Sequence, residues 1–190
     1  MQKSIEEHMV LCASVKKMEV ENHRVVCADG RTYEGEKIIT TIPWAEYDEI
    51  DGMPKELFQR KERLRHSSVQ IEYVSEHMDT KAQWIYYPEP EISYHRILVR
   101  HNFCPNSKGY WTETNKDRLI GVQTKGSSFC YMNEYAYPLN TIDKPEIMKE
   151  LLTWGKERNI YGLGRWGEHE HYNSDLVVEL AVKLAEELNQ

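Results

Sequence analysis

The chain has 190 residues, 40% of them hydrophobic, and carries a net charge of −7 with a pI near 5.7. This length suffices for one domain with a buried core, and the acidic balance argues against a general binder of nucleic acid or of anionic membranes. No apolar run approaches the ~20 residues of a membrane-spanning helix, and the acidic start does not resemble a signal peptide.

The first third of the chain is predicted to be rich in strands. Residues 10–20 and 23–28 read as two strands joined by a short turn, and Asp29-Gly30 marks a second turn before a short strand at 32–33. The β-branched run 36–43 ends at a proline, which is typical of a buried strand that stops at a loop.

The rest of the chain mixes strands with three predicted helices. Residues 54–64 read as a helix with Pro54 in its first turn. Further strands are expected at 68–74, 84–87, 94–99, 118–123 and 129–132. A second helix begins near Asp143, which can act as its cap, and a third, amphipathic helix runs from 174 or 175 to 188 with its leucines inward. The pattern predicts an α+β fold: a mixed or antiparallel sheet with flanking helices and a C-terminal helix.

Cysteines and aromatic residues add two expectations. The four cysteines, Cys12, Cys27, Cys104 and Cys130, lie far apart with no CxxC pair, which favours reduced thiols and a cytoplasmic location. Five Trp and 12 Tyr are many for this length; such residues form cores, and they also line sugar and flavin pockets.

The run 162–175, GLGRWGEHEHYNSD, is the most informative segment. A short apolar stretch at 159–161 precedes it and the amphipathic run 176–188 follows it. A strand, then glycines, then a helix N-terminus can hold an anionic ligand, because glycines allow close approach and Arg165 offers a planar donor fork. No GxGxxG follows an N-terminal strand, no GxxxxGK[ST] occurs, and no complete Rossmann βαβ unit is visible.

Three segments together resemble one family. The run GEKIITTIPW at 35–44 resembles the "vI.TiP" segment of flavin-containing amine oxidoreductases. The segments WIYYP at 84–88, YHRI at 94–97 and NFCP at 102–105 resemble a region of eukaryotic-type UDP-galactopyranose mutases, as does YPLN at 137–140 followed by the Gly-Arg loop and Asp175. The similarity covers roughly residues 10–188.

The resemblance implies a fragment of a larger flavoenzyme. In that superfamily an FAD-binding Rossmann domain comes first, so residues 1–190 would form a single substrate-binding-type domain. The strand, loop and helix of residues 159–190 would return to the flavin site. FAD would belong to the full-length protein, and this portion alone would not hold it tightly, because the N-terminal FAD-binding domain is its missing partner.

The resemblance also assigns site residues. Gly164, Arg165 and Gly167 would contact the flavin and its pyrophosphate, with Asn173 and Asp175 at the flavin edge. The alternatives are a surface Arg in a Gly-rich turn and two ordinary helix caps.

The candidate substrate residues are Arg96 and Tyr137, which the resemblance implies, and His171, which would form hydrogen bonds in the site or be an ordinary exposed histidine. Arg96 and Tyr137 match residues that contact the substrate diphosphate, whereas Arg96 could also be a solvent-facing strand residue and Tyr137 could pack against Pro138. His171 stands where bacterial mutases have Tyr, and Asn173 where they have Asp, so these two positions depart from the pattern.

Two histidines raise a further possibility. His169 and His171 would lie on one side of an extended segment, so two metal ligands are geometrically feasible, but no third ligand is signalled and no metal is expected. No catalytic residue is assigned.

The functional expectation is a flavin-dependent enzyme that resembles UDP-galactopyranose mutase. It would act on a nucleotide-sugar, or a similar small anionic metabolite, in cell-surface polysaccharide synthesis. The alternatives are a flavin amine oxidase or desaturase-type oxidoreductase domain, and a non-catalytic binding module that lost the flavin half. No nucleic acid and no membrane span are expected, and exposed apolar surface could pair two copies of the isolated domain.

Overall fold

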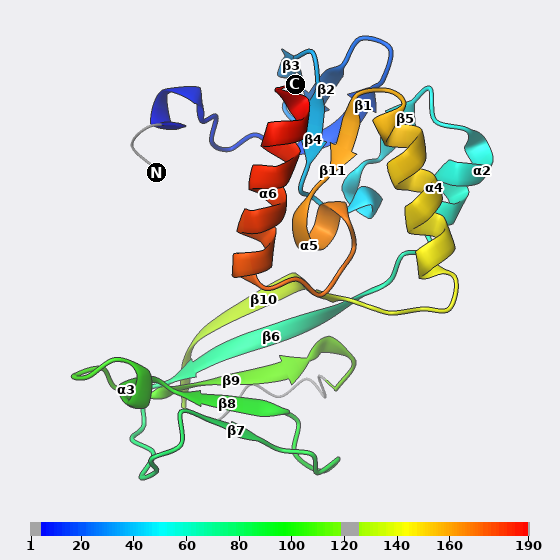
Figure 1. The fold of residues 1–190 in the computed structure, drawn as a ribbon. Helices are drawn as coiled ribbons and strands as arrows, with labels where there is room; N and C mark the ends of the chain where they lie inside the picture. Colours follow the sequence, from blue (N-terminus) through cyan, green and yellow to red (C-terminus); the bar gives the residue numbers. More distant parts are fainter. Residues whose placement is uncertain (1–4, 119–125, 190) are drawn as a thin grey trace. The chain divides into compact units, whose positions relative to one another are not determined.

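The computed structural model describes residues 5–118 and 126–189. The chain divides into two compact units, one built from Met1–Arg65 and Asn140–Gln190, the other from the continuous segment His66–Leu139. We call them the core unit and the sheet unit. The mixture of helices with antiparallel and parallel strands confirms the predicted α+β class (Figure 1).

The core unit contains two small sheets. A four-stranded sheet has the order β3-β2-β1-β5, formed by Thr32–Glu34, Arg24–Cys27, Val15–Glu19 and Glu49–Asp51. β11 (Ile160–Gly162) pairs in parallel with β4 (Ile38–Thr40), so residues 122 positions apart in the chain lie side by side. The core unit also contains two short 3-10 helices, η1 (Glu6–His8) and η2 (Trp44–Glu46).

Its helices are α2 (Lys55–Lys61), α4 (Lys144–Lys156), the single turn α5 (Gly164–Gly167) and α6 (Ser174–Leu188). One hydrophobic core joins strands to α2 and α4; its members include Met18, Trp44, Ile50, Leu57, Ile147, Leu151 and Ile160. The helices predicted from 54, 143 and 174 are therefore confirmed, and burial of Ile147 and Leu151 confirms the predicted inner face of the second.

Three local predictions in this unit differ from the structure. Asp143 is the residue before α4 but makes no capping hydrogen bond, because its carboxylate accepts from Thr141 Oγ1 at 2.7 Å and pairs with Arg63. The predicted strand at 10–20 forms only from Val15, since residues 10–14 have no strand partner. The inward leucines of α6 are half-buried at most, and no residue of that helix is buried.

The sheet unit is a single antiparallel sheet with the order β10-β6-β9-β8-β7 (Figure 1). Its strands are β6 (His66–Val74), β7 (Trp84–Tyr86), β8 (Arg96–Val99), β9 (Tyr110–Asn115) and β10 (Ser127–Pro138). α3 (Arg100–Phe103) follows β8, and η3 (Lys116–Arg118) follows β9. Strands were predicted at 68–74, 84–87, 94–99 and 129–132, and these are confirmed, but β9 was missed.

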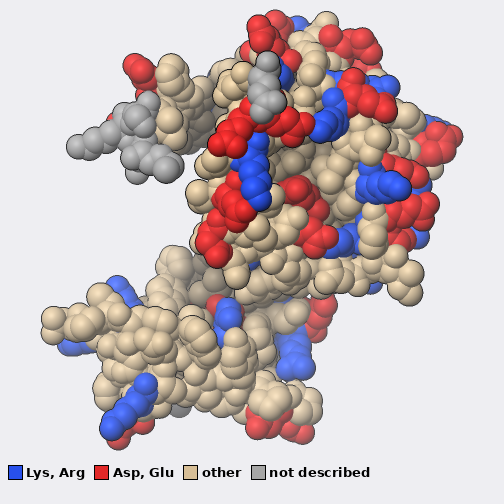
Figure 2. Space-filling view, viewed as in Figure 1, with Lys and Arg blue, Asp and Glu red and all other residues tan. Residues whose placement is uncertain are grey.

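The strand predicted at 118–123 falls mostly outside the described residues, and Arg118 itself belongs to η3. The four cysteines are free thiols. Within residues 5–118 and 126–189, no helix is both long and apolar enough to cross a membrane. Charged side chains of both signs are interspersed over α4 and α6 in the space-filling view (Figure 2).

Candidate functional site

The Gly-Arg loop begins where β4 and β11 end. Gly162 of β11 lies opposite Thr40 of β4, and the next amide, that of Leu163, donates to the Thr40 carbonyl at 2.9 Å. Both strands run in the same direction, so their carboxyl ends meet at this point. In open α/β sheets ligands bind outside the carboxyl ends of parallel strands, which makes this loop the first candidate site.

Two glycines of the loop are required by packing. A Cβ on Gly167 would lie 2.2 Å from the Thr40 carbonyl oxygen, and a Cβ on Gly162 would lie 2.3 Å from the Gly167 carbonyl oxygen. The Gly167 carbonyl also accepts a hydrogen bond from the buried Trp44 indole at 2.8 Å. Gly167 therefore has a structural role, and its contact with a cofactor stays a prediction.

The spacing of these glycines is itself informative, although it was not among the features predicted from the sequence. Residues 162–167 read G-x-G-x-x-G directly after a strand, the spacing of dinucleotide-binding loops. The helix that follows is only the single turn α5, and the long helix α6 starts seven residues later, at Ser174. The local geometry thus shares the close backbone packing of such loops without their long helix.

The amide of Gly164 already has an anionic partner. Gly164 adopts φ +76°, and its N–H donates to Glu168 Oε2 at 3.0 Å. Burial raises the pKa of the Glu168 carboxyl, an effect that the hydrogen bond from Gly164 opposes and the charge of Glu170 reinforces. A ligand anion at this amide would have to replace the Glu168 carboxylate.

Arg165 connects the loop, through side-chain hydrogen bonds, to the segment that leads into α6. Its Nε and Nη2 both donate to the Tyr172 carbonyl, at 3.2 and 2.8 Å. Gly164 and Arg165 line a pocket of about 460 Å³. The other lining residues are Thr41, Leu163, Trp166, Tyr172, Ser174, Val177 and Val178. The structure therefore brings two of the predicted cofactor residues into one cavity, whose walls are largely apolar.

Gly167, Asn173, Asp175 and His171 do not line that pocket. Asn173 precedes α6, but its side chain makes no capping hydrogen bond. Asp175 is exposed in the first turn of α6, where its negative charge interacts favourably with the positive end of the helix dipole. His171 is exposed in the segment between α5 and α6. The roles assigned to these residues stay predictions.

The extended segment expected around His169 and His171 is not observed, and the two histidines differ in burial. His169 adopts φ +52°, which breaks the extended alternation, and it is only 3% exposed, with Nε2 3.0 Å from the Arg65 carbonyl oxygen. Among the described residues no group of three or more His, Cys, Asp or Glu is arranged to hold a metal ion.

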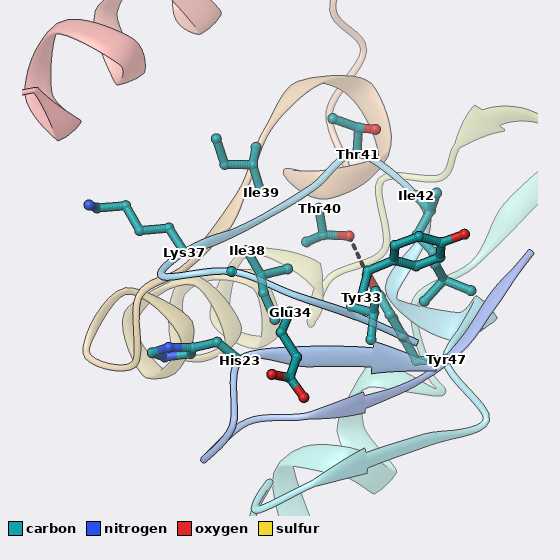
Figure 3. A pocket seen from close by; sticks show the side chains of 13 residues that line it. His23, Tyr33, Glu34, Lys37, Ile38, Ile39, Thr40, Thr41, Ile42 and Tyr47 are labelled. Carbon is teal, nitrogen blue, oxygen red and sulfur yellow. Dashed lines mark hydrogen bonds between the residues drawn. The ribbon is translucent and has the colours of Figure 1, made fainter. Parts of the chain in front are cut away.

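A second cavity of about 330 Å³ runs along β4 and includes Thr41, which also lines the first (Figure 3). It is lined by residues 37–42, which lie within the segment that resembles flavin-containing amine oxidoreductases, together with residues of β2 and β3. Thr40 Oγ1 and the Tyr47 hydroxyl lie 2.8 Å apart, and burial raises the pKa of Tyr47 even though that hydrogen bond opposes the effect. Ile39 stays 48% exposed beside this cavity.

In the sheet unit the structure brings Arg96 and Tyr137 together. Arg96 Nη2 lies 3.5 Å from the Tyr137 hydroxyl, and Arg96 Nε and Nη2 donate to Glu113 Oε2 at 2.9 and 2.5 Å. Burial acts to lower the pKa of Arg96, but hydrogen bonds with Tyr86, Glu113 and Tyr137 and the charge of Glu113 outweigh it and raise that pKa. Glu113 was not singled out from the sequence, because only the register of β8 against β9 places it opposite Arg96.

Glu113 and Arg96 lie within an aromatic face. Residues directly opposite one another across paired strands share a face of the sheet. The rows through Arg96 and Leu98 therefore define this aromatic face, formed by Trp84, Tyr86, Tyr73, Trp111, Phe129 and Tyr131. Trp111 contacts both Tyr73 and Phe129, with ring centroids 5.0 and 5.9 Å apart. Tyr86 and Tyr131 remain 60% and 55% exposed.

Known proteins share this fold. No protein-family profile and no curated protein sequence matches the chain. The crystal structure of reduced UDP-galactopyranose mutase matches 87% of this chain with a TM-score of 0.68 and 15% identity. A CLA-producing fatty acid isomerase from P. acnes matches 92% of it with a TM-score of 0.67 and 13% identity. The fold implied by the sequence resemblance is therefore confirmed. The chain spans 44% and 47% of the lengths of these two structures.

Proposed function

We propose that this chain is the substrate-binding, C-terminal portion of an FAD-dependent enzyme that acts on a nucleotide-sugar. The observation that carries the proposal is the Gly164-Arg165 loop at the carboxyl ends of the parallel strands β4 and β11, in a fold shared with a UDP-galactopyranose mutase and a fatty acid isomerase.

The residues present fit half of a flavin site. Gly164 and Arg165 line a cavity with the aromatic Tyr172, and the Gly164 amide already holds a carboxylate. β4 and β11 form a parallel sheet of only two strands, and Ile39 on β4 is 48% exposed. Parallel sheets are normally covered on both faces. We infer that a dinucleotide-binding domain outside these residues supplies the rest of that sheet and holds the adenosine diphosphate end of FAD.

FAD, when bound, supplies the redox chemistry of its isoalloxazine ring. The chain's own residues would then bind and orient the substrate. Arg96 and Tyr137 offer a guanidinium and a hydroxyl 3.5 Å apart for the oxygens of a diphosphate, and we assign His171 to the substrate as well. The role in cell-surface polysaccharide synthesis and the cytoplasmic location, which four free thiols favour, belong to the same proposal.

A second candidate is a flavin oxidoreductase, of the amine oxidase or desaturase type, with an apolar substrate. The specific observation that favours it is the pairing of Arg96 with Glu113, because an arginine already neutralised by a carboxylate attracts a diphosphate less strongly. The exposed aromatic face around this pair would suit an apolar molecule. A non-catalytic module that lost its flavin half is the third reading.

The first experiment concerns the flavin. The coding sequence upstream of Met1 is searched, in the same reading frame, for a segment predicted to form a strand followed by GxGxxG. The protein that contains both this segment and the present chain is then produced. We expect a yellow protein with one FAD, whose affinity falls by about tenfold or more in Arg165→Ala and stays within about twofold in the control Arg158→Ala. The 190-residue chain alone should not hold flavin stoichiometrically. An upstream start codon with no such segment would overturn the proposal and favour the binding module.

The second experiment separates the two enzyme types. In the flavin-containing protein, Arg96→Ala should weaken UDP-sugar binding by about tenfold or more if a diphosphate is the ligand, whereas Arg31→Ala should leave it unchanged. Binding is measured by isothermal titration calorimetry. Unchanged UDP-sugar binding in Arg96→Ala would contradict the role of Arg96 in substrate binding. Absence of UDP-sugar binding by the natural protein would contradict the nucleotide-sugar substrate and support the oxidoreductase.

A further inference from the structure

A separate pocket lies in the sheet unit, where β6 ends, α3 follows β8 and β9 begins. Its volume is about 360 Å³. It is lined by Ser75, His77, His101, Ser107, Lys108 and Gly109. None of these residues belongs to the flavin or substrate sites described above. The volume is at the lower end of the range of small-molecule pockets, about 300–1,000 Å³.

The part of the lining formed by residues 107–109 is held in place by hydrogen bonds. The Ser107 hydroxyl donates to the Cys104 carbonyl at 2.7 Å, and the Tyr73 hydroxyl donates to the Lys108 carbonyl at 2.9 Å. Gly109 adopts φ +75°, and a Cβ there would lie 2.3 Å from the Val74 carbonyl oxygen. The loop is thus fixed closely against the end of β6, so the pocket has a defined shape.

Two imidazole rings also line the pocket. His77 and His101 stack with ring centroids 4.8 Å apart and an interplanar angle of 28°. The Nδ1 atom of His101 is buried and has no hydrogen-bond partner in the part of the chain that the structure describes. Buried polar atoms are normally hydrogen-bonded, so the His101 ring, which lines the pocket, carries a nitrogen that lacks its usual partner.

The charge of the pocket is opposite to that of the chain. Its lining holds one ammonium, two imidazoles and two hydroxyls but no carboxylate, in a chain with a net charge of −7. Glu76 lies between Ser75 and His77 in the sequence but does not line the pocket. Its Oε1 atom is 3.2 Å from the position that a Cβ on Gly126 would occupy. The Ser107 hydroxyl hydrogen is already used, so the available donors are Ser75, Lys108 and the two imidazoles.

We propose that this pocket binds the phosphate group of a small phosphorylated molecule. A phosphate offers several acceptor oxygens to converging donors, and hydrogen bonds between charged partners are the strong ones. A metal ion is a poorer match, because only two imidazoles are present and no third ligand joins them among the described residues. The proposal does not depend on the flavin site.

The test is to titrate the 190-residue chain with inorganic phosphate and, separately, with glycerol 3-phosphate. Binding is measured from the chemical shifts of the histidine ring protons in NMR spectra. We expect saturable shifts of the His77 and His101 signals, absent with sodium chloride at equal ionic strength. Tighter binding of glycerol 3-phosphate would identify a phosphomonoester, and tighter binding of inorganic phosphate would identify the free ion; either supports a phosphate site. Absence of saturable shifts with both would overturn it.

Variants show whether the pocket is responsible. The pair His101→Gln and Lys108→Ala should weaken binding by about tenfold or more when combined, whereas the controls Lys81→Ala and His8→Gln should change it by less than about twofold. Because a variant can fail to fold, thermal unfolding is measured for each. Phosphate should raise the unfolding midpoint of the natural chain and not that of the folded double variant. An equal rise in both would contradict the proposed site.

Discussion

Glu168 acts as an internal anion for the Gly-Arg loop. Its carboxylate accepts the Gly164 amide, and burial raises the pKa of Glu168 above its ordinary value. A carboxyl whose pKa is raised on folding contributes stability at low pH, and that contribution is lost as the pH rises through the folded-state pKa. The ionised side chain is therefore a cost to the loop at neutral pH.

The substitution Glu168→Gln tests this directly, because the amide oxygen can still accept from Gly164 but carries no charge. We expect the variant to gain stability relative to the natural chain at pH 7.5 and to lose that advantage near pH 4, as measured by urea unfolding. The control is Glu157→Gln at an exposed position. An advantage for Glu168→Gln that is the same at both pH values would contradict a raised pKa.

Arg96 and Glu113 form an ion pair within the aromatic face. Their side chains are only 22% and 12% exposed, so removal of one charge leaves the other poorly solvated. We expect Glu113→Gln to lower the free energy of unfolding by about 1–3 kcal/mol in urea. Glu134→Gln, which breaks the Lys116–Glu134 pair at 51% and 47% exposure, should cost less than about 1 kcal/mol. Equal losses would show that the Arg96 pair is no more buried in solution than a surface pair.

At the scale of elements, the loop between β11 and α6 depends on close backbone contact. Gly167→Ala places a methyl group 2.2 Å from the Thr40 carbonyl oxygen, so either β4 or α5 must move. We expect a loss of about 1–3 kcal/mol in the free energy of unfolding, measured by urea denaturation. Gly35→Ala is the matched control, because its methyl would lie at an ordinary 3.4 Å from its nearest neighbour. Similar small effects of both changes would show that the loop relaxes freely.

The same elements show what sequence patterns can predict. β6 and α4 follow simple hydrophobic periodicity, and both were predicted. β9 was missed because its buried positions are Thr112, Glu113 and Thr114, which carry no hydrophobic alternation. In the candidate site, Gly164 and Arg165 are readable because their pattern is local. The Arg96–Glu113 pair and the Glu168–Gly164 bond depend on register and backbone conformation, which no local pattern reveals.

At the scale of the whole molecule, the two units bury different kinds of residue. The hydrophobic core cluster, from Met18 to Ile160, lies wholly within the core unit. The sheet unit buries Val74, Ile97 and Val99 beside the polar Glu72 and Thr112. Much of its apolar surface, the aromatic face above all, stays exposed. Exposed apolar surface of this extent is typical of a ligand-binding or interaction face.

The core unit also leaves apolar surface exposed, on α6. Val178 and Val182, one turn apart, are 58% and 53% exposed, although the helix is amphipathic. We expect this surface to pair two copies of the 190-residue chain in solution when no other domain covers it. Val178→Ser combined with Val182→Ser should then shift sedimentation toward the monomer. Glu179→Ser combined with Lys183→Ser, on the same helix, should leave the distribution unchanged. A natural chain that sediments as a monomer up to about 100 μM would contradict this pairing, because association driven by apolar burial strengthens with concentration.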